Sequence, residues 1–144
     1  MSGRLVDTDA RFKLAKLLRH LAAGRISNFD FENKMPNSED PAVDAIESSI
    51  WCFYDDFEEM KFVGKRRLSK DQKHTIARWI LFLYTSEPYE WPQFPYPGVR
   101  PVQHGFLSRL LGKKVKEEQF MIYGEYSVWP FTDDQNFSSA KKGK

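Results

Sequence analysis

The sequence predicts a mainly α protein: a single compact domain of four or five helices with a small C-terminal extended or β-hairpin element. Apolar residues recur at helical spacing over several stretches that each begin with a helix-capping residue. Prolines and glycines separate these stretches. The chain has 144 residues, 41% of them hydrophobic, which suits one domain over residues 1–137.

A helical hairpin is predicted over residues 7–34. Gly24 is placed to end the first helix in the left-handed conformation, and Ser27 with Asp30 begins a short second helix. The apolar stripe of the first helix consists of Leu14, Leu17, Leu18 and Leu21.

Residues 17–34 read LLRHLAAGRISNFDFENK: a helix, a glycine, a basic residue, Ile, Ser and then an acid–aromatic–acid run. This pattern resembles the short C-terminal domain family. In that family such hairpins are thought to mediate oligomerisation or docking, so the resemblance implies a docking role. The hairpin is N-terminal here, which departs from the family. The remainder of the chain is similar to small bacterial proteins that have no assigned function.

An acidic-faced helix is predicted over residues 40–60, because Asp40–Pro41 provides an N-cap followed by proline at the first helical position. The face opposite its apolar stripe carries acids and one tryptophan: Asp44, Trp51, Asp55, Glu58 and Glu59. An exposed tryptophan ringed by carboxylates suits a basic partner surface. The alternative is that the hairpin or the C-terminal segment covers Trp51.

The chain is organised around a helix predicted over residues 69–85 and an aromatic, proline-rich turn at 86–98. Prolines exclude both helix and central strand from the turn. Its rings follow every two or three residues: Tyr89, Trp91, Phe94 and Tyr96. We expect these rings to pack on the protein's own helices. The alternative is that the turn is a proline-rich ligand or an aromatic docking groove, in which Tyr89 and Trp91 contact a partner.

A C-terminal segment follows over residues 99–137. Apolar residues on both sides of Gly124 predict an extended or hairpin element within 118–129. Residues 138–144 are small and basic, and we expect a disordered tail there. The pattern leaves open whether Trp129 is buried.

The net charge of +2 is too small to indicate nucleic-acid binding by itself. Basic residues nevertheless gather in two blocks, 61–73 and 100–116. They include Lys65, Arg66, Arg67, Arg109, Lys113 and Lys114. Because phosphate binding requires positive charge on one face, these blocks define the first alternative, a nucleic-acid-associated protein.

The sequence predicts no catalytic residue, no cofactor and no metal site. His20, His74 and His104 are not at ligand spacing with one another or with Cys52, and no glycine-rich phosphate loop occurs. The second alternative is an enzyme built at the aromatic turn. Its ionisable groups would be Glu87, Glu90 and His104.

We therefore expect a non-enzymatic protein that works through a protein–protein surface, for example as an inhibitor or immunity-type protein. One cysteine excludes an intramolecular disulfide, and no apolar stretch follows the N-terminal residues, which favours the cytoplasm. No apolar run is long enough to span a bilayer. The sequence leaves open the identity of the partner, any substrate, and whether the protein is a homo-oligomer.

Overall fold

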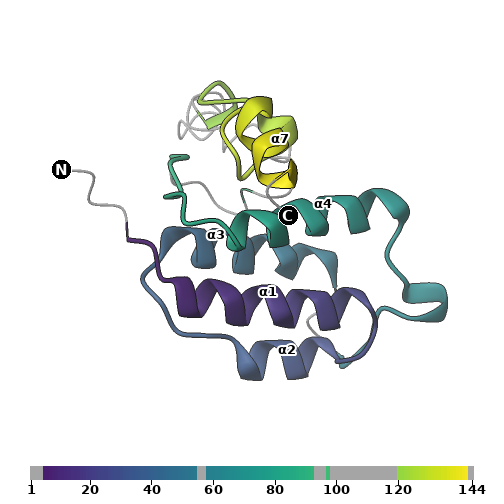
Figure 1. Ribbon diagram of the computed structural model, residues 1–144. Coiled ribbons are helices and arrows are strands. Elements are labelled where there is room, and N and C mark those ends of the chain that lie inside the picture. The colour runs from purple at the N-terminus through teal and green to yellow at the C-terminus, as the bar shows by residue number, and fades with distance from the viewer. Residues whose placement is uncertain (1–4, 55–57, 93–96, 98–119, 143–144) are drawn as a thin grey trace, which may run out of the picture.

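The computed structural model describes residues 5–54, 58–92, 97 and 120–142 (Figure 1). Within these residues the regular structure is entirely helical, which confirms the predicted mainly α fold. The α-helices are α1 (Thr8–Ala22), α2 (Asn28–Lys34), α3 (Pro41–Ile50), α4 (Lys70–Leu83) and α7 (Asp134–Lys142). The 3-10 turns are η1 (Trp51–Phe53), η2 (Gly64–Arg66) and η3 (Tyr126–Val128).

Helix α1 lies at the centre of the N-terminal half. It runs antiparallel to α4 along its side, and it also packs against α2 and α3 (Figure 1). Helix α7 packs on α4, on the side away from α2 (Figure 1). Helices α1 and α7, from the two halves of the chain, therefore both pack on α4, the helix around which the sequence was predicted to be organised.

The helix starts follow the local chemistry of the sequence. Ser27 and Asp30 form the capping box of α2, and Ser69 and Gln72 form that of α4. Asp40 caps α3, with a proline in the first turn. Each cap satisfies backbone N–H groups that the first helical turn leaves without partners. These helix starts were therefore predictable without tertiary contacts.

The turn between α1 and α2 depends on Gly24, whose φ is +75°. A Cβ at this position would lie 2.4 Å from Val63 Cγ1 and 2.9 Å from the carbonyl oxygen of Phe62. The hairpin turn thus packs directly on the segment that leads to α4.

We expect Gly24→Ala to lower the free energy of unfolding by more than the left-handed conformation alone costs, about 1–2 kcal/mol. Gly64 is the matched control, because its φ is +59° but a Cβ there would meet nothing within 4 Å. Urea denaturation of both variants measures the difference. Equal losses would show that the hairpin turn has room for a methyl group.

The rings of the aromatic turn and the C-terminal segment close the core. Trp79, Trp91 and Trp129 are all fully buried. Trp129 meets Trp79 edge to face with ring centroids 5.6 Å apart, and its Nε1 donates to the hydroxyl of Tyr89 at 3.1 Å. Trp91 Nε1 donates to the carbonyl oxygen of Phe131 at 3.2 Å. The described rings of the turn therefore pack on the protein itself, as the first of the two interpretations expected.

The predicted β-hairpin within 118–129 is wrong for the part of it that the structure describes. From residue 120 onward the backbone forms helical turns, including η3, and no strand. Glu125 N–H donates to the carbonyl oxygen of Thr132 at 2.9 Å, and a Cβ on Gly124 would lie 2.5 Å from the same oxygen. The segment folds onto the residues before α7 rather than pairing with itself.

The C-terminal end also differs from expectation, because α7 continues to Lys142 through residues that were predicted to be a disordered tail from residue 138. Phe137 packs against Phe131 with ring centroids 5.3 Å apart. Lys141 Nζ lies 4.6 Å from the centre of the Phe137 ring. These ring contacts dock a helix whose composition is otherwise polar.

The acidic-faced helix is shorter than the predicted 40–60, since α3 ends at Ile50 and continues only as η1. The buried side chain of Asn28 explains the path of the following segment. Its Nδ2 donates to the carbonyl oxygen of Glu58 at 3.1 Å, and its Oδ1 accepts from Met60 N–H at 2.8 Å. A long-range contact thus satisfies backbone groups that a longer helix would have paired internally.

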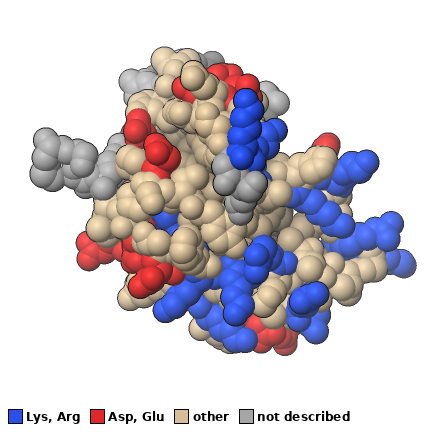
Figure 2. Space-filling view, viewed as in Figure 1, with Lys and Arg blue, Asp and Glu red and all other residues tan. Residues whose placement is uncertain are grey.

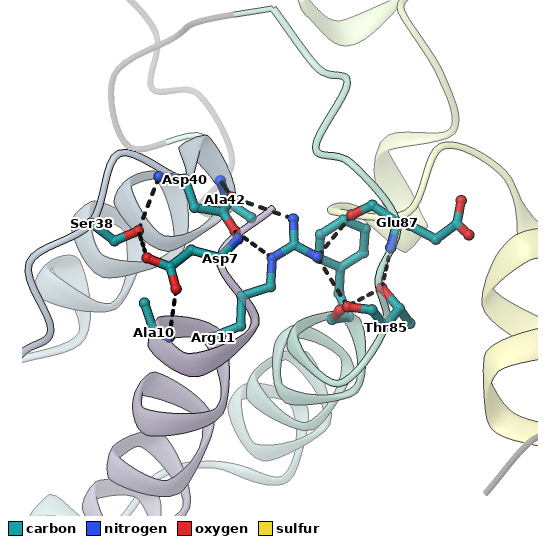
Figure 3. A network of polar contacts seen from close by, with 9 residues as sticks. Asp7, Ala10, Arg11, Ser38, Asp40, Ala42, Thr85 and Glu87 are labelled. Atoms are coloured by element: carbon teal, nitrogen blue, oxygen red, sulfur yellow. Dashed lines mark hydrogen bonds and ion pairs between the residues drawn. The ribbon is translucent and has the colours of Figure 1, made fainter. Parts of the chain in front are cut away.

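A buried ion pair joins three parts of the chain (Figure 3). Arg11 on α1 and Asp40 are both fully buried, with Nε and Oδ2 2.6 Å apart. Arg11 Nη1 also donates to the carbonyl oxygens of Thr85 at 3.1 Å and Glu87 at 2.8 Å. The guanidinium lies 5.1 Å from the ring centre of Phe82. One side chain therefore ties α1 to the start of α3 and to the segment that follows α4.

Asp7 extends this network at the start of α1 (Figure 3). Its backbone N–H donates to Asp40 Oδ2 at 2.8 Å. Its carboxylate accepts from the hydroxyl of Ser38 at 2.7 Å and from Ala10 N–H at 3.1 Å. The hydrogen bond from Ser38 has the larger effect in lowering the pKa of Asp7, and the hydrogen bond from Ala10 N–H lowers it further.

Candidate functional site

A hollow of about 380 Å³ lies between α2 and the C-terminal part of α3. We call it the α2–α3 groove. The described residues that line it are Phe31, Glu32, Asp44, Glu47, Ser48, Trp51 and Tyr54. Aromatic and acidic side chains therefore dominate its walls, and Phe31 borders it with a side chain that is otherwise part of the core.

Helical spacing explains how one side of the groove is built. Asp44, Glu47, Ser48 and Trp51 stand at positions i, i+3, i+4 and i+7 of α3 and its continuation η1, so they share one face. Glu32 reaches the groove from α2. The packing of α1 against both α2 and α3 holds the two sides of the groove in place.

One carboxylate orients two of the aromatic side chains. Trp51 Nε1 donates to Glu32 Oε2 at 3.1 Å, and the hydroxyl of Tyr54 donates to the same oxygen at 2.8 Å. Trp51 nevertheless remains 43% exposed. An exposed ring that is already held in place loses little conformational entropy when a partner binds to it.

The carboxylates of the groove lie close enough to influence one another. Burial raises the pKa of Glu47, and the negative charges of Asp44 and Glu32 raise it further. The two ion pairs that the described residues form with one another lie elsewhere in the molecule. The groove therefore presents negative charge beside aromatic rings, an arrangement that attracts a cation.

Two further residues predicted to contact a partner are exposed but lie outside the groove. Glu58 pairs with Arg66, and Glu59 Oε2 accepts from the hydroxyl of Ser27 at 2.5 Å. Both sit near the start of α2, whereas the groove is built on its later turns. Asp55 lies outside the described residues.

Tyr89 and Trp91 are 3% and 0% exposed, so in this structure they belong to the core and offer no surface to a partner. Three residues that line the groove were not among those predicted for the site: Glu32, Glu47 and Tyr54. The spacing from Glu47 to Trp51 was a usable signal, since residues four apart share a helical face. Nothing in the local sequence indicated Glu32, which precedes Trp51 by 19 residues.

The ionisable groups of the enzyme alternative do not gather in the described part of the chain. Glu87 and Glu90 are both exposed, and Glu90 accepts a long hydrogen bond of 3.4 Å from the hydroxyl of Tyr123. His104 lies outside the described residues. Burial raises the pKa of the Cys52 thiol, which is opposite to the shift that activates a nucleophilic cysteine.

Within the described ranges, no group of three or more His, Cys, Asp or Glu side chains is placed to hold a metal ion. No described helix is long and apolar enough to cross a membrane.

In the first basic block, the residues predicted to bind nucleic acid are all exposed and lie at or beside η2. They are Lys65, Arg66 and Arg67. The second block, with Arg109, Lys113 and Lys114, lies outside the described residues. Only the first block can therefore be related to the fold.

Comparisons of the chain with known protein families, with curated proteins and with solved structures found no match. The resemblance of residues 17–34 to the short C-terminal domain family therefore stays a prediction. Residues 8–34 form the helices α1 and α2 and the turn between them.

Proposed function

We propose that this protein is a non-enzymatic binding protein whose α2–α3 groove takes a basic segment of another protein. The observation that carries the proposal is the exposed indole of Trp51, held by Glu32 beside two further carboxylates. Tryptophan is enriched among the residues that dominate binding energy at protein interfaces. A role as an inhibitor or immunity-type protein, which covers a basic surface of its target, is one form of this function.

The groove suits a lysine or arginine side chain for two separate reasons. A cation over the face of Trp51 or Tyr54 gains a cation–π interaction, about 0.5–2 kcal/mol depending on how fully it is desolvated. Asp44 and Glu47 are acceptors for charge-assisted hydrogen bonds. Burial is the main cause of the raised pKa of Glu47, and a bound cation offsets the repulsion from Asp44 and Glu32 that adds to it. Both effects are lost with a neutral or acidic partner.

Trp51→Ala is expected to weaken binding of a short amidated peptide of alternating Lys and Arg by about thirtyfold or more, the loss typical of an interface hot spot. Isothermal titration calorimetry measures this directly. Quenching of Trp51 fluorescence provides a second readout, because the other three tryptophans are buried.

Charge-matched variants separate the groove from the general charge of the protein. Glu47→Gln and Glu39→Gln each remove one negative charge, but only Glu47 lines the groove, and Glu39 is exposed in the loop before α3. We expect Glu47→Gln to weaken peptide binding clearly more than Glu39→Gln. Equal effects of the two, or unchanged affinity in Trp51→Ala, would contradict the proposal.

Peptide binding should also weaken as the pH falls. The pKa of Glu47 is raised above its ordinary value of 4.5, so this carboxylate becomes protonated at a higher pH than an exposed glutamate. A basic peptide prefers the ionised form, and its affinity is therefore lost as pH decreases through that raised pKa. Calorimetry at a series of pH values tests this, and Glu47→Gln should reduce the pH dependence.

The same group affects stability with the opposite sign. Because its pKa is raised in the folded state, the native protein binds a proton before the unfolded chain does. The contribution of Glu47 to the free energy of unfolding therefore increases as pH falls through the raised pKa and is complete below 4.5. If peptide affinity fell only because the protein unfolds in acid, the parent protein would lose stability over the same pH range. Glu47→Gln would then leave that loss of stability unchanged.

A further inference from the structure

The small net charge conceals an uneven distribution. Residues 58–73, together with Arg19 and Arg25, contain eight Lys and Arg but only three Asp and Glu, and all of these side chains are exposed. Contacts of Gly24 with Phe62 and Val63 bring the α1–α2 turn against this segment. Figure 2 shows Lys and Arg gathered over the end of the molecule where the α1–α2 turn meets residues 58–73. Most Asp and Glu of the viewed face lie elsewhere.

Positive charge continues from this end along α1 and reaches an exposed ring. Arg19 Nη1 donates to the hydroxyl of Tyr84 at 3.2 Å, and the Phe12 and Tyr84 rings have centroids 5.6 Å apart. Lys16 lies four residues after Phe12 and three before Arg19, so all three share one helical face. Lys73 lies three helical turns before Tyr84 on the same face of α4. Phe12 is 45% exposed.

We propose that this surface, which we call the α1–α4 basic track, binds single-stranded nucleic acid. The phosphates would follow the basic residues from η2 towards Lys16, and a base would stack on Phe12. Proteins that bind single strands combine a positive surface that follows the backbone with aromatic rings on which bases stack. Arginine adds bidentate contacts to phosphate oxygens. This inference does not depend on the α2–α3 groove, which carries the opposite charge and lies on α2 and α3.

Two features favour a single strand over other anionic partners. A lipid surface would require a group of apolar side chains beside the basic ones. Phe62 and Leu68 within residues 58–73 are buried, and the exposed Phe12 lies at the other end of the track, on α1. Among residues 58–73, Val63 is the large apolar side chain that is exposed, and its exposed fraction is 53%. A duplex keeps its bases stacked inside the helix, so it cannot offer one to Phe12.

The test uses a fluorescein-labelled oligothymidylate of about 16 nucleotides, the upper end of site sizes for such surfaces. Fluorescence anisotropy should show an affinity that falls with salt, with a logarithmic slope of about −0.7 for each phosphate contacted. Phe12→Ala should weaken binding by about 5- to 150-fold, the usual effect of removing one stacking ring. Lys16→Glu should weaken binding and make the salt dependence less steep.

Lys34→Glu is the matched control, because it changes the net charge equally but lies on α2, outside the track. It should weaken binding far less than Lys16→Glu, and thermal melting should show that all three variants remain folded. Binding that does not depend on salt, or equal effects of Lys16→Glu and Lys34→Glu, would overturn the proposal. So would binding to vesicles containing phosphatidylserine without binding to the oligonucleotide, or tighter binding to a duplex with no effect of Phe12→Ala.

Discussion

Replacing Arg11 by alanine should lower the free energy of unfolding by about 3–5 kcal/mol, because removing one partner of a buried ion pair leaves an uncompensated charge inside the protein. Asp40 is fully buried and would lose its positive partner. The carbonyl oxygens of Thr85 and Glu87 would each lose a donor as well. Guanidinium denaturation followed by circular dichroism measures the loss.

Lys13→Ala is the matched control, since it removes one positive charge from an exposed position on the same helix and should change stability by at most about 0.5 kcal/mol. The double variant Arg11→Met with Asp40→Asn should lose less than the sum of the two single variants, because the pair is coupled. Asparagine also preserves the N-cap of α3. If Arg11→Ala resembled Lys13→Ala, the buried network would have no structural role.

The second large effect is expected for Trp91→Ala, which should cost about 3–5 kcal/mol through the cavity it leaves. Trp91 is fully buried, and its ring lies 5.0 Å from that of Phe120 and contacts Tyr123 and Tyr126. Its loss would also leave the carbonyl oxygen of Phe131 without the indole donor. Since a domain is stable by only about 5–15 kcal/mol, this single change should bring the protein close to unfolding at moderate temperature.

Trp51→Ala provides the contrast, because Trp51 is exposed and its substitution should leave stability within about 0.5–1 kcal/mol of the parent. We therefore expect one tryptophan to govern folding and the other to govern peptide binding. Thermal melting and calorimetric titration of both variants separate the two roles. A Trp51→Ala variant that unfolds as readily as Trp91→Ala would identify Trp51 as part of the core instead.

The predictions that the structure confirms depend on local chemistry. The capping boxes at Ser27 and Ser69 and the proline after Asp40 act within four residues, so they mark helix starts in any environment. The predictions that the structure contradicts concern segments whose conformation depends on distant contacts. The apolar residues on both sides of Gly124 fit a hairpin, but packing of Trp129 on Trp79 favours helical turns in the folded protein.

The candidate groove shows the same division. Acidic residues and a tryptophan on one face of α3 were apparent from helical spacing, and so was the possibility of a basic partner. The carboxylate that holds the indole comes from another helix, and no periodicity relates Glu32 to Trp51. Only the packing of α1 against α2 and α3 makes them neighbours.

The amino-acid sequence by itself determined the helical character of this chain, the starts of its main helices and the separation of its acidic and basic residues, because these depend on groups a few residues apart. The tertiary structure alone decided which tryptophans are covered. Trp51 follows Ile50 in a helical stretch and Trp91 stands between Glu90 and Pro92 in the aromatic turn, but neither local pattern determines whether the ring is covered. Their burial depends on which distant side chains pack over them, and that is set by the whole fold.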